Sequence, residues 1–490
     1  MRARHAIAIA AIAATISSGC TVGPDYVKPQ VETPPAWRIE YSQAADAANT
    51  RWWEQFGDPV LTDLIETALR ENRDLVIAAA RVDAFLGQLN TTRAQFYPQA
   101  GYDLNASRNR SSTVGVTPLP AGTDPYYTLY QASLGASWQI DLFGRVRRQS
   151  EAARAQVYST EQGRRGVVLS LVTSMATSYI GLRALDRQLE ISTQTVQNYG
   201  NTLRIFELRH KGGFVSKLEL AQIRSQYQQA LAAVPSLEQQ IAAQENLIAV
   251  LQGRNPYLIP RGKSFDELAI PGIPGGLPST LLERRPDILQ AEQDLVAANA
   301  NIGAAKALYY PQLSLTGLFG SVSTAFGDFL SGPATTWAVA ADFAGPVFSA
   351  GAIAGQVTTA EAGTTAALAS YQQTVLIALR ETNDALTGTV KKRQESEALA
   401  DRVTSLREYA RLSRTRFDNG YADYIEVLYA ENELFAAELT AVRSKADRYA
   451  QVVAVYRALG GGWIDLADQS TAAGKATPVV ERADKQKLLP

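Results

Sequence analysis

The sequence of 490 residues has few of the side chains that enzymes use for nucleophilic and metal chemistry. It has one cysteine, Cys20, and two histidines, His5 and His210. A single cysteine excludes an intramolecular disulfide, and neither a nucleophile–base pair nor a His/Cys metal cluster can be assembled. A phosphate-binding loop of P-loop spacing is also absent. The sequence therefore predicts a protein that is not an enzyme, has no cofactor or metal, and takes its energy from a partner.

Two further absences concern charge and hydrophobic runs. The 47 basic and 48 acidic residues give a net charge of -1, and no basic cluster indicates a nucleic-acid partner. No apolar run reaches the roughly 18 to 20 residues of a membrane-spanning helix. The uncharged stretch 166–182 contains interleaved Ser, Thr and Gly, which favours packing against other helices. Whatever crosses a membrane here is expected not to be a hydrophobic helix.

The N-terminus has the features of a bacterial export signal. Two arginines precede an apolar run, 6–16, and small residues then lead to Cys20. We interpret 1–19 as a lipoprotein signal peptide and Cys20 as the lipidated first residue of the mature protein. The alternative is an ordinary secretory signal, since Ser17 stands where lipoprotein signals usually carry an aliphatic residue. Thr21, rather than Asp, follows the cysteine, which favours sorting to the outer membrane.

The mature sequence is a tandem duplication, and such a repeat constrains architecture more than any single motif. Residues recur at an offset of 213 and, after small loop insertions, at an offset of 207. The matched pairs are Asp74/Asp287, Leu75/Ile288, Tyr97/Tyr310, Pro98/Pro311, Gln99/Gln312, Arg209/Arg416, Gly213/Gly420, Phe214/Tyr421 and Glu219/Glu426. The predicted parts are an N-terminal segment (20–57), a first repeat (58–252), a linker rich in Pro and Gly (253–278), a second repeat (279–464) and a poorly ordered polar tail (465–490).

Each repeat contains two predicted strands. Apolar and polar residues alternate over 130–142 and 102–107, and more weakly over 313–319 and 337–343. One apolar and one polar face match the wall of a transmembrane barrel, with 111–125 as an outer loop. Four strands cannot close a barrel, and an open sheet in lipid leaves its edge groups unsatisfied. Several chains must therefore share one barrel; the alternative is a half-buried sheet in a soluble domain.

Long helices follow the strands. The range 144–211 contains no proline, so one helix of about 100 Å is allowed. In the return helices that follow, apolar residues recur at a spacing close to 3.5 over 220–251 and 428–456, which predicts coiled-coil packing. Pro235 predicts a local kink in the first of them. The fold class is thus mixed α and β.

Six motifs then identify a family. In order they are CTVGPDYVKP from Cys20, RWWEQFGDPVLTDLIETAL from Arg51, IDLFGRVRR from Ile140, LLERRPDILQAE from Leu281, YYPQLSL from Tyr309 and LGGGW from Leu459. With these motifs, the chain resembles outer-membrane efflux proteins of the TolC and OprM type, in the NodT-type lipoprotein branch that serves pumps of the resistance-nodulation-division (RND) class.

The resemblance implies a homotrimer with a 12-stranded transmembrane β-barrel, continued by a long periplasmic helical barrel. It also implies anchoring in the outer membrane by lipid, and partners in a periplasmic adaptor (membrane fusion) protein and an inner-membrane RND transporter. The implied function is passive conduction of small toxic compounds to the exterior. Two alternatives stay open, which are a duct for type I protein secretion and a purely structural trimeric coiled-coil protein.

The turns between the long helices are the predicted functional tips. A glycine directly after a helix suits the left-handed conformation, which predicts that role for Gly213 and Gly420. The resemblance implies adaptor contacts at the tips and acidic residues around the pore constriction. The adaptor-contacting residues would be Arg209, Gly213, Phe214, Arg416, Gly420 and Tyr421, and the gate residues Glu219 and Glu426.

A simpler reading of the two glutamates also stands. Each follows Ser216 or Asp423 at the spacing of a capping box, so each could cap its own helix. Arg209 and Arg416 could likewise only complement the helix dipole.

Overall fold

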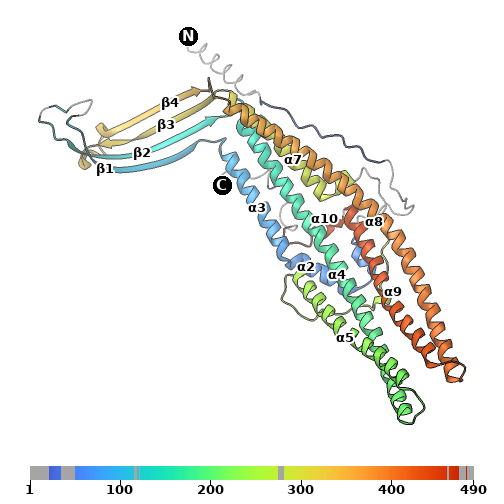
Figure 1. Cartoon of the computed structure of the whole chain (residues 1–490). Helices are drawn as coiled ribbons and strands as arrows, with labels where there is room; N and C mark the ends of the chain where they lie inside the picture. Colours follow the sequence, from blue (N-terminus) through green and yellow to red (C-terminus); the bar gives the residue numbers. More distant parts are fainter. Residues whose placement is uncertain are drawn as a thin grey trace.

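The computed structural model describes residues 21–34, 50–114, 119–120, 122–273, 281–460, 463–473 and 482. The predicted signal peptide and Cys20 lie outside these residues. The described molecule is elongated, with a β-sheet at one end and paired long helices at the other (Figure 1).

The duplication is visible in the order and length of the elements. The first repeat comprises α2 (Pro59–Glu71), α3 (Arg73–Ala94), β1 (Gln99–Arg110), β2 (Tyr126–Ile140), α4 (Arg145–Lys211) and α5 (Lys217–Leu251). The second comprises α6 (Leu281–Arg284), α7 (Pro286–Lys306), β3 (Gln312–Ser323), β4 (Thr335–Ala344), α8 (Ala352–Asp418) and α9 (Tyr424–Leu459), and α10 (Trp463–Asp468) follows. Helices α4 and α8 each have 67 residues, so each is about 100 Å long, as predicted.

The four strands form one antiparallel sheet in the order β1-β2-β3-β4. The register pairs Tyr102 with Leu134, Leu134 with Phe319, and Phe319 with Trp337. Directly paired residues share a face, so these four exposed side chains form one apolar band across the sheet. The predicted alternation is confirmed, and the edges of β1 and β4 have no partner strand within the described chain.

Helix α4 is the central helix of the protomer. It packs against α3, α5, α7 and α9, and Val168, Val172 and Met175 on it are fully buried. By length and composition, α4 is the one helix among the described residues that could cross a membrane, but 67% of its apolar window is buried. The interpretation of this stretch as a packing surface is therefore confirmed.

An aromatic cluster lies in the main hydrophobic core of the protomer. The ring of Trp52 stacks on Tyr456 at 4.8 Å and meets Trp53 and Trp463 edge to face. Arg164 joins α10 to α4 through Asp468, with an N–O distance of 2.5 Å. Helix α10 begins at Trp463, just before the predicted tail, and continues into it as far as Asp468, so the expectation of a poorly ordered tail is wrong for 465–468.

The connection between the repeats packs against the core. Residues 253–273 cross the core with Ile259, Phe265 and Leu268 buried. The composition predicted a linker here, and its buried apolar side chains hold this linker against the helices. Helix α5 continues through Pro235 without interruption.

Candidate functional site

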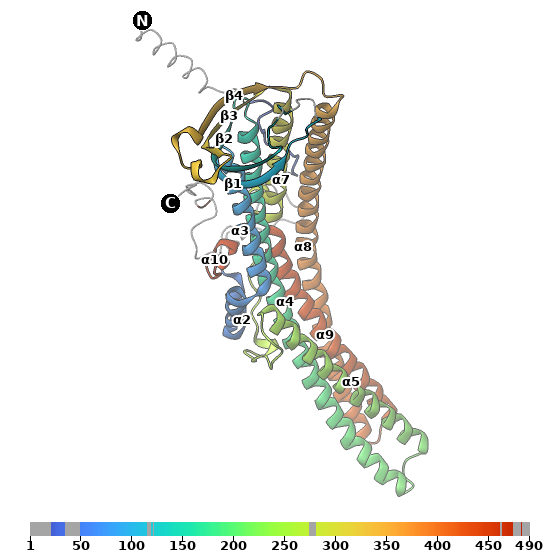
Figure 2. The same ribbon diagram turned by 90° about the vertical axis from the view of Figure 1, so that its left-hand side faces the viewer.

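Two similar turns form the end of the molecule farthest from the sheet (Figure 2). After α4, Gly213 has φ +80°, and the N–H of Phe214 donates to the Arg209 carbonyl at 2.9 Å. After α8, Gly420 has φ +76°, and the N–H of Tyr421 donates to the Arg416 carbonyl at 2.9 Å. Both turns are Schellman motifs, which explains the two glycines, because a side chain is strained at this φ.

The tips combine a shared core with exposed aromatic rings. Phe206 of α4 and Tyr424 of α9 pack at a ring distance of 4.5 Å inside a small buried cluster, which joins the two hairpins. Phe214 and Tyr421 instead point away from this core, with 82% and 78% of their surface exposed. Large exposed rings at matched positions are typical of a binding surface.

Glu219 caps its own helix. Its carboxylate accepts the backbone N–H of Ser216 at 2.8 Å, and the Ser216 hydroxyl accepts the N–H of Glu219 at 3.2 Å. These hydrogen bonds from Ser216 hold the pKa of Glu219 below its ordinary value. The carboxylate therefore stays charged through the neutral range.

Glu426 occupies the matched position but has a different partner. The side chain of Asp423 makes no capping hydrogen bond, and Glu426 forms an ion pair with Arg416 of α8 at 2.9 Å. A carboxylate at the cap position repels a second carboxylate three residues later, whereas a serine attracts it. Glu219 thus caps its own helix, as the alternative interpretation predicted, and Glu426 does not. Arg416 pairs with Glu426 across the α8–α9 hairpin.

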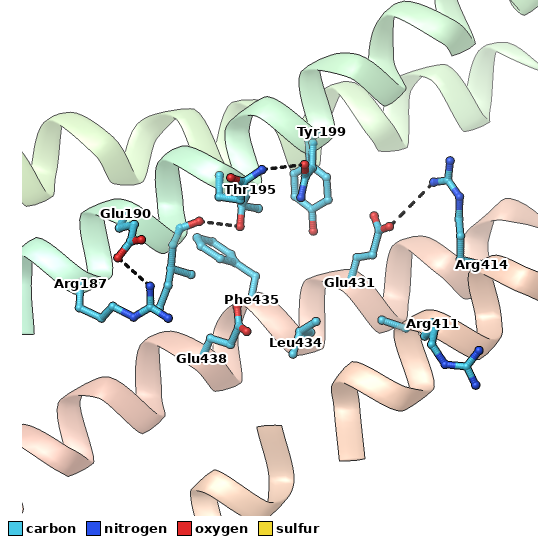
Figure 3. A pocket seen from close by; sticks show the side chains of 14 residues that line it. Arg187, Glu190, Thr195, Tyr199, Arg411, Arg414, Glu431, Leu434, Phe435 and Glu438 are labelled. Carbon is cyan, nitrogen blue, oxygen red and sulfur yellow. Dashed lines mark hydrogen bonds and ion pairs between the residues drawn. The ribbon is translucent and has the colours of Figure 1, made fainter. Parts of the chain in front are cut away.

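A second charged region lies above the tips and was not found from the sequence. Helices α4, α8 and α9 line a partly open cavity of about 520 Å³ (Figure 3). Glu431 faces Arg414 across it at 3.9 Å, and burial raises the pKa of Glu431. The buried Tyr199 lies beside it. Helical periodicity marks such residues only as interior, so no sequence signal separated them from other core positions. The described residues contain no group of three or more His, Cys, Asp or Glu that could hold a metal.

The N-terminal strap, 21–34, follows the helices toward the sheet (Figure 1). Its Val22 N–H donates to the Phe143 carbonyl, just after β2, at 3.3 Å. Lys28 pairs with Glu292 at 2.8 Å, and the mostly buried Arg148 pairs with Asp25 at 2.7 Å. These contacts fix the start of the described chain at the base of the sheet.

The fold and the sequence match known proteins over nearly the whole chain. The family described as "Outer membrane efflux protein" matches residues 64–254 and 277–461. The chain belongs to this family. The toluene efflux pump outer membrane protein TtgC of Pseudomonas putida is 32% identical, over 94% of this chain and 96% of that one.

Two further matches agree with this assignment. The probable outer membrane lipoprotein SilC of Salmonella typhimurium is 31% identical, over 92% of this chain and 97% of that one. The open-state outer membrane channel MtrE of Neisseria gonorrhoeae has a TM-score of 0.81 and 28% identity, covering 90% of this chain and 98% of that one.

Family membership shows which end of the molecule lies in the membrane and which lies in the periplasm. The protein is an outer-membrane efflux channel, and its four strands form one third of a 12-stranded barrel built by three chains. This barrel satisfies the edges of β1 and β4, as the argument on unsatisfied strand edges requires. The apolar band of the sheet faces lipid, and the long hairpins extend into the periplasm.

Proposed function

We propose that this channel conducts small toxic organic compounds, delivered by an inner-membrane RND transporter through a periplasmic adaptor. The observation that carries the proposal is a lipid-facing sheet joined to two helices of about 100 Å, which end in matched turns with exposed rings. The name of the toluene efflux relative supports small organic cargo over protein export. In a strain lacking its own channel, the gene should restore solvent tolerance only when the adaptor and transporter are present.

The two tips are the proposed adaptor contacts. Phe214 and Tyr421 would enter apolar depressions on the adaptor, while Gly213 and Gly420 set the shape of the turns and Arg209 and Arg416 flank them. Replacing both rings by glutamate should abolish adaptor cross-linking and solvent tolerance while the trimer and its conductance persist. Unchanged cross-linking would contradict this contact.

Glu219 and Glu426 are the proposed residues of the pore constriction. Six carboxylates in a trimer attract cations and repel one another by roughly 3 kcal/mol per neighbouring pair at about 6 Å and an effective dielectric near 20. In planar bilayers, Glu219→Ala/Glu426→Ala should raise single-channel conductance and reduce cation preference.

Two control variants separate the gate from the local bonds of each tip. Ser216→Ala weakens the cap of Glu219 but keeps its charge, and Arg416→Ala frees the Glu426 carboxylate. Neither should reduce cation preference if the carboxylates line the constriction. Conductance that is the same in the double variant and the wild type would leave the glutamates with local roles alone.

Cys20 is the proposed lipid anchor. The strap fixes Thr21 at the base of the sheet, where an acyl chain on the preceding residue could enter the membrane, and a relative is named a lipoprotein. Intact mass spectrometry of the mature protein should find acyl chains in the wild type and none in Cys20→Ala. An unmodified cysteine in the wild type would contradict the anchor.

A further inference from the structure

Two arginines lie at the outer end of the sheet, and neither has a role in the proposed conduction of compounds through the channel. Arg108 and Arg110 end strand β1, and strand alternation puts them on its lipid-facing side. Both side chains are exposed. The Arg110 guanidinium lies 5.6 Å from the centre of the Tyr126 ring, and Arg108 donates to the Thr128 hydroxyl at 3.4 Å. Neither arginine forms an ion pair within the described ranges of the chain.

The β3–β4 connection, 324–334, folds onto this same side. The rings of Phe326 and Phe329 lie 5.4 and 6.5 Å from the ring of Tyr130, which belongs to the lipid-facing set. Phe326 and Leu330 keep 73% and 90% of their surface exposed. A loop that closed the pore would pack on the polar face, whereas this loop presents apolar side chains outward.

The two arginines and the β3–β4 connection lie at the height expected for the outer boundary of the membrane. Trp138 and Tyr130 lie eight residues apart on β2, or about 26 Å along the strand, close to the roughly 25 Å of an outer-membrane apolar band. Register pairs Arg108 with Thr128 and Arg110 with Tyr126, just beyond Tyr130. The two arginines therefore lie where the headgroups of the outer leaflet begin.

We propose that Arg108 and Arg110 bind the phosphate groups of an outer-leaflet glycolipid, whose acyl chains pack against Phe326 and Leu330. Guanidinium groups bind phosphate through two parallel hydrogen bonds, and neither of these two arginines has a carboxylate partner among the residues that the structure describes. The apolar loop beside them can contact the acyl chains of a lipid, which a free phosphate ion lacks. The loop therefore favours a lipid as the ligand. The trimer would carry three such sites around its outer rim.

Native mass spectrometry of the full-length trimer, titrated with bis-phosphorylated lipid A, tests the site. Arg108→Gln/Arg110→Gln should weaken binding by about fivefold per arginine, since a cation near an anionic lipid surface contributes about 1 kcal/mol. The matched control Arg73→Gln/Arg81→Gln removes two exposed arginines of α3 and should change nothing. Dephosphorylated lipid A should bind the arginine variant and the wild type equally.

A second pair of variants tests the apolar half of the site. Phe326→Ser/Leu330→Ser should weaken the binding of both lipids, and the bilayer conductance of every variant should match the wild type, which shows an intact channel. Asp124 and Asp328 are the acidic side chains of the two outer loops. Carboxylates can bind lipid phosphate through a bridging divalent cation, so each titration is repeated with a chelator that removes such cations. Equal lipid A binding by wild type and arginine variant, or a loss that vanishes with the chelator, would overturn the proposal.

Discussion

The two repeats make the same contact with different side chains. In the first repeat, Asn72 precedes α3 and donates from Nδ2 to the Leu251 carbonyl at the end of α5, at 2.8 Å. In the second, Arg285 precedes α7 and donates from Nη1 to the Ala458 carbonyl at the end of α9, at 2.8 Å. The last carbonyls of a helix lack helical partners. The position therefore requires a buried donor, and either an amide or a guanidinium can fill it.

The long hairpins show a second difference, a reversal of charge. Glu207 of α4 pairs with Arg224 of α5 at 2.9 Å, and both side chains are largely exposed. The matched pair in the second repeat is Arg414 of α8 and Glu431 of α9, at 3.9 Å, with Glu431 turned into the cavity of Figure 3. Both hairpins keep an ionic link at this matched position, but only the link in the second repeat faces the cavity.

The largest expected effect comes from removing the donors. Arg285→Met should lower the unfolding free energy by about 3 kcal/mol, because the Ala458 carbonyl loses its charged donor inside the core. The Thr382 hydroxyl, 3.4 Å from the same oxygen, replaces it only in part. Asn72→Ala should cost about 2 kcal/mol through the lost carbonyl bond and the lost N-cap of Leu75. Thermal unfolding of the trimer, at one protein and detergent concentration, measures both.

The relative order of these two losses sharpens the comparison. Arg285→Gln should recover part of the loss seen in Arg285→Met, because an amide suffices in the first repeat. No recovery would show that the second repeat needs the ion pairs of Arg285 with Asp287 and Glu381 as well.

The tips should respond alike to loss of their glycines. Gly213→Ala and Gly420→Ala should each destabilise by about 1 kcal/mol, since both hold φ near +80° and a methyl group meets no atom within 4 Å. The cost is therefore backbone strain alone. Gly355→Ala in α8, also in open space, should instead stabilise by about 0.5 to 1 kcal/mol. A large difference between the two tips in calorimetry would show that their turns are not equivalent.

Local patterns were enough to predict much of this architecture. The alternation over 130–142 predicted β2, which runs from Tyr126 to Ile140, and the two tip glycines predicted the left-handed turns. The partner of Glu426 was beyond the sequence, because it depends on where α8 places Arg416. The cavity around Glu431 was missed for the same reason, since it depends on how α4 packs against the distant α8–α9 hairpin. The roles of the tips in gating and docking stay predictions.

Exchanging the cap residues of the two tips should exchange the bonding patterns of Glu219 and Glu426. Ser216→Asp should release Glu219 from its cap, and Asp423→Ser should attract Glu426 away from Arg416, each at under about 1 kcal/mol. A lowered pKa means that the Glu219 cap stabilises above its unfolded pKa and is lost as pH falls through the folded pKa. Stability measured from pH 7 to 3 should therefore fall less in Ser216→Ala, which adds no titrating group, than in wild type. Equal slopes would contradict the role of Ser216.

The smallest expected effect tests the reversed ion pair. Burial raises the pKa of Glu431 and Arg414 offsets this only in part, so the charged carboxylate costs stability as pH rises above its unfolded pKa. Glu431→Gln should therefore raise the unfolding temperature at pH 7, by the equivalent of at most about 1 kcal/mol, and change little near pH 4. Glu207→Gln in the exposed pair should instead lose less than about 0.5 kcal/mol at neutral pH. Opposite signs at matched positions would show that burial, rather than pairing, decides what each glutamate contributes, and a loss in both variants would mean that Arg414 holds Glu431 as firmly as Arg224 holds Glu207.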